Sequence, residues 1–312
     1  MKQTKNRAIL FLLIFTPFFA ESIASTNTPW FRFLNLGVFL FMVSLYGTAA
    51  LVLRELCVRK KVGFGRFLMY GTMFASLNEG IVANTWFKVN ALSFNSQELV
   101  RIAGTNWHLV VNLIIFHTLF SMLIPILLSF TLFPQLNQVK LLKNKWMLIC
   151  VGLLLLMAFG SLIPKHHMMV VDFKHRLALM IVIIFAALLY IIIPHYQSQH
   201  KPTETYSFKK MLLIGAGFSL MFTISYFFLP KAIPGASILF SLTLYIGSTF
   251  LAYRISKNAS YELWSVLPII IGLMFPIFAL SFIKIGILQP VISGLFLIYI
   301  YWLYRNRQNS LA

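Results

Sequence analysis

Glu79 and His117 are the two residues whose types and positions most favour chemistry in this chain of 312 residues. Both lie inside long apolar segments, at about 12 Å and about 15 Å from the same end of their expected helices, taking a rise of about 1.5 Å per residue. A carboxylate in such a segment is costly unless it is paired, protonated or beside water, so it is a candidate functional site. We predict that Glu79 and His117 form a hydrogen-bonded pair.

Other polar residues are expected in the same outer half of these helices: His108, Asn112, Asn78, Asn84 and Glu21. Together with the pair they predict a polar cluster in a cavity open to the outside. A His or Asn in a membrane helix more often makes an interhelical hydrogen bond than takes part in chemistry, and an acid near the interface can extend to water. That structural reading is weaker for Glu79, because a buried acid is a costly way to join two helices.

A Glu followed by two His in neighbouring segments is also the pattern of membrane-embedded hydrolases, where these groups activate water directly or through a metal. His108 and His117 are separated by nine positions, so at about 100° per residue they face opposite sides of an unbroken helix. We therefore predict no metal centre and no bound cofactor, and assign no catalytic residue. Cys57 and Cys150 have no metal-site or disulfide spacing.

The composition requires lipid around these residues. The chain is 59% hydrophobic and 11% charged, which leaves too little polar surface for a soluble domain of this length. Continuous apolar runs of about 20 residues predict membrane-spanning helices rather than a barrel. We predict an all-α polytopic bundle, one membrane domain over residues 1–312, with ten spans near residues 8–24, 33–53, 67–87, 107–133, 146–164, 177–194, 211–229, 236–253, 263–283 and 287–304.

The net charge of +19 comes from 26 Lys and Arg residues in short connections, which indicates orientation and not nucleic-acid binding. Roughly two thirds of them fall on one side if both termini are cytoplasmic. The outer side still receives several cations, Arg176 among them. We expect a bacterial cytoplasmic membrane protein whose partners are the lipid bilayer and a small polar substrate or ion. Ser22-Ile23-Ala24 also fits a signal-peptidase site, and cleavage there would leave nine spans.

Several short motifs carry a resemblance over roughly residues 15–135: Tyr46-Gly47 leading to Arg54-Glu55, Tyr70-Gly71, Asn78-Glu79-Gly80, and Trp107-His108 with His117, Ser121 and Pro125. This pattern resembles an uncharacterised family of bacterial multi-pass membrane proteins, and the resemblance implies no activity. Members tend to have Glu-Glu-Gly where this chain has Asn78-Glu79-Gly80, so one carboxylate is missing. The Glu-then-His order is also similar to the prenyl-protease-like (CPBP) intramembrane peptidases, whose Glu-Glu-x-x-x-Arg motif is absent.

Three functions fit these observations. The first is a transporter or permease in which Glu79 binds a proton, a cation or a polar substrate part-way across the bilayer. The second is a membrane-embedded peptidase or lipid-modifying hydrolase that uses Glu79 as general base with His108 or His117. The third is an assembly or regulatory subunit without chemistry. Convergence of Glu79 with both histidines would favour the second.

Overall fold

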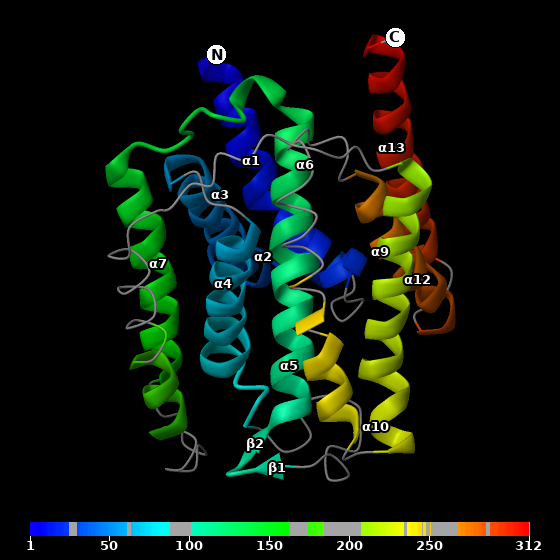
Figure 1. Ribbon diagram of the computed structural model, residues 1–312. Coiled ribbons are helices and arrows are strands. Elements are labelled where there is room, and N and C mark those ends of the chain that lie inside the picture. The colour runs from blue at the N-terminus through cyan, green and yellow to red at the C-terminus, as the bar shows by residue number, and fades with distance from the viewer. Residues whose placement is uncertain are drawn as a thin grey trace.

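The molecule is a bundle of long helices, with a small hairpin at the end of the bundle opposite to both chain termini (Figure 1). The strands β1 (Arg101–Ile102) and β2 (Thr105–Asn106) form this hairpin and pair antiparallel. The computed structural model describes residues 1–24, 30–60, 64–87, 101–162, 174–181, 183, 207–233, 236–244, 246–247, 250, 267–284 and 288–311. Its helices confirm the all-α prediction.

Several helices change from α to π geometry part-way along their length. The N-terminal elements are α1 (Lys2–Phe18), π-helix η1 (Phe19–Ala24), 3₁₀-helix η2 (Trp30–Leu34), α2 (Leu36–Met42), π-helix η3 (Val43–Gly47), α3 (Thr48–Lys60), α4 (Phe64–Ala75), π-helix η4 (Ser76–Val82), α5 (Trp107–Phe116), π-helix η6 (His117–Leu123), α6 (Ile124–Leu132) and 3₁₀-helix η7 (Pro134–Leu136). The later elements are α7 (Asn144–Leu162), α9 (Phe208–Thr223), π-helix η8 (Ile224–Phe228), α10 (Leu229–Ala232), α12 (Leu267–Lys284) and α13 (Leu288–Leu311).

Five helices in the described part of the chain are long and apolar enough to cross a membrane: Lys2–Ala24, Leu36–Lys60, Trp107–Leu132, Asn144–Leu162 and Phe208–Phe228. Each coincides with one of the predicted spans. Shorter apolar helices occupy Leu267–Pro276 and Ser293–Leu303. The predicted spans 177–194 and 236–253 lie in part outside the described residues. The chain is therefore a membrane protein with several membrane-length helices.

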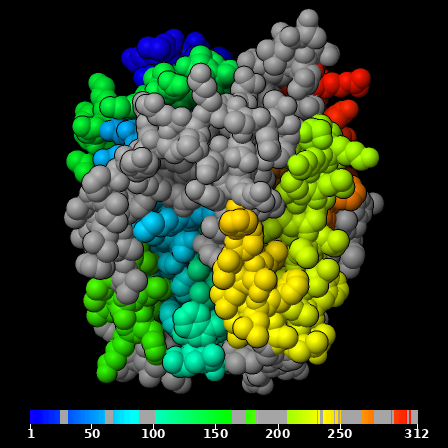
Figure 2. Space-filling model, viewed as in Figure 1, coloured from blue at the N-terminus to red at the C-terminus, as the bar shows by residue number. Residues whose placement is uncertain are grey.

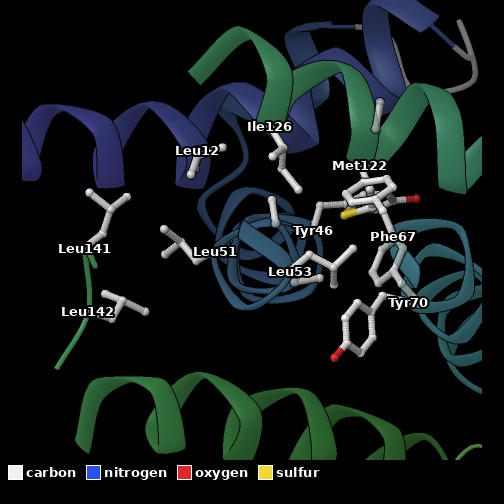
Figure 3. Packing of buried hydrophobic residues seen from close by; sticks show 14 of the residues in the cluster. Leu12, Tyr46, Leu51, Leu53, Phe67, Tyr70, Met122, Ile126, Leu141 and Leu142 are labelled. Carbon is white, nitrogen blue, oxygen red and sulfur yellow. The ribbon is translucent and has the colours of Figure 1, made fainter. Parts of the chain in front are cut away.

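The continuous helix from α5 to α6 is the centre of the bundle (Figure 1). Most of its residues are buried, whereas α7 at one edge exposes large apolar side chains such as Leu148 and Leu156. Figure 3 shows one core cluster, in which Leu12, Met122 and Ile126 gather around Tyr46. Lipid tails are as apolar as these side chains, so close packing and interhelical hydrogen bonds hold such a bundle together.

Arg54 and Glu55 join the connection between α6 and α7 to the middle of α3. The two side chains form an ion pair of 2.8 Å, and both are buried rather than exposed to headgroups. Arg54 also donates to the carbonyl of Val139 at 2.7 Å, and the N–H of Leu141 donates to Glu55 at 2.8 Å. These contacts give Arg54 and Glu55 a structural role.

Candidate functional site

Four π-helical segments contribute residues to a buried polar network. Glu21 lies on η1, Tyr46 on η3, Glu79 on η4 and His117 on η6. Short π-helices are rare and occur often at functional sites. Their convergence on one network makes it the candidate functional site.

Glu79 and His117 form the predicted hydrogen-bonded pair, with Oε1 of Glu79 2.6 Å from Nε2 of His117. The His117 side chain is 3% exposed and that of Glu79 is 10% exposed, so the carboxylate is the more accessible partner. Nδ1 of His117 lies 2.9 Å from the hydroxyl oxygen of Ser121. Both ring nitrogens are thus engaged, and the imidazole connects an acid with a hydroxyl.

Asn78 and Tyr46 extend the network to a second carboxylate. The amide of Asn78 donates to the Tyr46 hydroxyl at 2.9 Å and to Glu79 Oε1 at 3.1 Å, and it lies 3.3 Å from His117 Nε2. The Tyr46 hydroxyl in turn donates to Glu21. At position 78 this chain has Asn, where the resembled family tends to have Glu. Glu21, on another helix, supplies a carboxylate that is connected to Asn78 through Tyr46.

The chain folds back over Glu79 directly after η4. Asn84 has a φ of 60°, a left-handed conformation that Asn adopts more readily than most residues. This turn brings the N–H of Thr85 to the carbonyl of Glu79 at 2.8 Å and the hydroxyl of Thr85 to the Glu79 carboxylate. Both carboxylate oxygens of Glu79 consequently have hydrogen-bond partners.

Two glycines of the sequence motifs allow the helices of the network to approach. Pro17 has no N–H to offer the carbonyl of Leu13, and a Cβ on Gly47 would lie 2.6 Å from that carbonyl oxygen. Glycine at position 47 thus lets α1 pack closely on η3, beside Tyr46. A Cβ on Gly71 would overlap the side chain of Thr118. Glycine there brings α4 against η6, beside His117.

Arg176 stabilises the end of η4 that follows Glu79. The sequence places this cation on the outer side, and the structure buries its side chain in the helical residues 174–181. Its Nε donates to the carbonyl of Ile81 at 3.0 Å, and its Nη2 donates to the carbonyls of Ile81 and Ser161. These bonds connect η4, α7 and residues 174–181 around the site.

The structure places His108 and Asn112 in a separate cluster. Asn112 donates to the hydroxyl of Ser241 at 2.9 Å, and Ser225 donates to Asn112 at 3.3 Å, while His108 contacts Asn112 and stacks on Tyr226. Figure 2 shows the helix that contains residues 236–244 at the surface between α4 and α9. Glu79 thus pairs with one histidine and not with both.

The network is suited to proton transfer and to binding a small cation or polar solute. Its side chains are carboxylates, a phenol, an imidazole, an amide and hydroxyls, which can donate and accept hydrogen bonds in sequence. Within the described residues, no three His, Cys, Asp or Glu side chains are arranged to hold a metal ion.

A model of an uncharacterized membrane protein family matches residues 10–305. The chain belongs to this family. The match extends well beyond residues 15–135, so the C-terminal helices are family features too. No curated protein and no solved structure matches the chain, and the comparisons therefore show no link to CPBP peptidases.

Sequence reasoning left Tyr46, Thr85 and Ser121 outside the predicted site. Ser121 had a usable signal, because a residue four positions after His117 shares its helix face. Tyr46 belongs to a sequence motif, but an aromatic residue in an apolar helix gives no sign of a polar role. Thr85 had no signal, since its contact depends on the turn at Asn84.

Proposed function

We propose that this protein is a transporter of the bacterial cytoplasmic membrane, with ten spans and both termini in the cytoplasm, that binds a proton, a cation or a polar substrate at Glu79 and His117. Both chain ends lie at the same end of the bundle (Figure 1), which agrees with an even number of spans. Lys5 donates to the carbonyl of Lys140 at that end, in keeping with the positive-inside rule.

The observation that carries the proposal is the Glu79–His117 contact of 2.6 Å inside a network from four helices. Ionisable groups at membrane depth that pair with one another are characteristic of substrate and ion pathways. A purely structural contact would not need the acid, because Asn or Ser side chains join membrane helices at lower cost. The residual exposure of the Glu79 side chain, 10%, leaves it within reach of a solute.

The test uses purified full-length protein in liposomes loaded with a small-molecule extract of the bacterial cell. Release of each compound is followed by mass spectrometry, and proton movement by an enclosed pH-sensitive dye. We expect the wild type to release a defined set of compounds or protons, and Glu79→Gln and His117→Ala to lose this activity.

Glu55→Gln is the matched control, because it neutralises a buried carboxylate outside the network. It should retain activity in every preparation that inserts and folds normally. The transport proposal fails if liposomes with the wild type release no compound or proton beyond what protein-free loaded liposomes release. It also fails if Glu79→Gln and His117→Ala both show the wild-type rate of release.

A second candidate is a membrane hydrolase, and the order Ser121–His117–Glu79 favours it. A hydroxyl, an imidazole and a carboxylate in hydrogen-bonded sequence can activate a serine nucleophile. This version uses His117 and Ser121, because His108 lies in the other cluster. A fluorophosphonate probe should then label the wild type and not Ser121→Ala, with Ser129→Ala as the control that keeps labelling. Absence of labelling in the wild type would remove this candidate.

A further inference from the structure

Three buried polar atoms without a hydrogen-bond partner lie just beyond Glu79. They are Oδ1 of Asn84, Nε1 of Trp86 and Nδ2 of Asn106. The three residues are 2%, 3% and 0% exposed. Buried polar groups in native proteins nearly always have partners, so three without one in connected segments call for an explanation. A bound solute supplies one.

The backbone joins these residues to one another and to Glu79. The N–H of Asn106 donates to the carbonyl of Trp86 at 2.9 Å, so the turn after η4 and the start of α5 are in direct contact. Thr85, between Asn84 and Trp86, donates to the Glu79 carboxylate. The edge of the Trp86 ring at Cε3 packs on Gly80, where a Cβ would lie 2.9 Å away.

The local structure explains why Asn occurs at positions 106 and 84 but gives no partner to the three atoms. Oδ1 of Asn106 accepts the N–H of Leu109 at 3.2 Å and so caps α5, which leaves the amide donor unused. The left-handed φ of Asn84 explains why Asn stands at this turn, but a cap of this kind needs no buried side-chain oxygen.

We propose that Asn84, Trp86 and Asn106 form a substrate subsite for an amino acid. The two unused donors, on Trp86 and Asn106, suit the two oxygens of a carboxylate. The unused oxygen of Asn84, with the negative charge of Glu79 close by in the chain, suits an ammonium group. An amino acid carries both groups and so offers a partner of the right kind to each of the three atoms. The subsite rests on the proposed transport function and names its substrate class.

The test measures equilibrium binding of a mixture of tritiated amino acids to the purified full-length protein in detergent, followed by single amino acids. The wild type should bind at least one of them saturably. Trp86→Phe removes the donor and keeps an aromatic ring, and Asn106→Asp removes the donor and keeps the capping oxygen. Each should weaken binding about tenfold or more, as loss of one hydrogen bond to a charged group implies.

Matched controls share the residue type and lie elsewhere. Trp146→Phe changes an exposed Trp, and Asn137→Asp changes a half-buried Asn in the connection after α6, whose buried Oδ1 also lacks a partner. Both should bind like the wild type, and thermal unfolding should show that all variants are folded. If folded Trp86→Phe and Asn106→Asp bind as tightly as the wild type, the subsite proposal is wrong. It is also wrong if the wild type binds no amino acid, and water would then be the partner of the three buried atoms.

Binding and transport can fail separately. A protein that binds an amino acid through Trp86 and Asn106 but moves no solute in liposomes supports the subsite and refutes transport. A protein that moves another compound in a Glu79-dependent way but binds no amino acid supports transport and refutes the subsite.

Discussion

Replacing Glu79 by Ala should destabilise the protein by an amount that the contacts of its carboxylate define. His117 Nε2 loses its acceptor, and stranding one buried donor costs about 1–3 kcal/mol. Asn78 keeps the Tyr46 hydroxyl as acceptor and Thr85 keeps the Glu79 carbonyl, so each loses only one bond of about 0.6 kcal/mol in a membrane. The sum is about 2–4 kcal/mol.

The assay is thermal or denaturant unfolding of Glu79→Ala, His117→Ala and the double variant in lipid nanodiscs. Most of the single-variant cost comes from one stranded partner, which the double variant no longer contains. We therefore expect the double variant to be less destabilised than the sum of the singles by about 1–3 kcal/mol. Additive effects, within about 0.5 kcal/mol, would refute a direct contact between Glu79 and His117.

Three further predictions concern the scaffold. Gly272→Ala places a Cβ on the backbone of α9 and should lower the unfolding free energy by about 1–3 kcal/mol. Gly217→Ala has open space around its Cβ and should stabilise by about 0.5–1 kcal/mol. Equal melting temperatures for the two variants would contradict the close crossing of α9 and α12. Arg54→Met leaves the buried Glu55 with Arg59 as its remaining ion-pair partner, and it should cost about 1–3 kcal/mol because buried acceptors of Arg54 lose their donor. This cost should be seen as faster proteolysis of the connection after α6; unchanged proteolysis would count against it. Asn112→Leu should lower thermal stability and keep Glu79-dependent release from liposomes, and loss of release would place the second cluster in the same site.

The contact between Glu79 and His117 could be predicted because it depends on depth and on which helices are neighbours, although both residues lie on π-helical segments. The rise per residue of an α-helix sets both side chains at similar depth, and a short connection makes their helices neighbours. The separation of His108 from this pair was predictable from the rotation per residue of an α-helix. Residues 107–116 form an unbroken α-helix, so the rotation of about 100° per residue applies between them.

The rest of the network depends on features without a sequence period. A π-helix places more residues in each turn than an α-helix, so side chains on and after it leave the face that α-helical counting assigns. Glu21 and Tyr46 both lie on such segments, and their contact joins residues from different helices. Burial of Arg176 likewise follows from carbonyls on η4 and α7, which no hydropathy pattern reveals.

The convergence of four π-helices on one network argues that the network, not the packing of the bundle, determines their position. A bundle needs only apolar faces and small residues at crossings, and regular α-helices provide these with better backbone hydrogen bonding. Four of the five π-helical segments in the described part of the chain contain Glu21, Tyr46, Glu79 and His117, and the fifth, η8, contributes Ser225 to the second polar cluster. Each of the four orients a polar side chain toward the others inside the bundle. The backbone irregularity is therefore better explained by the hydrogen bonds of the network than by the packing of apolar faces.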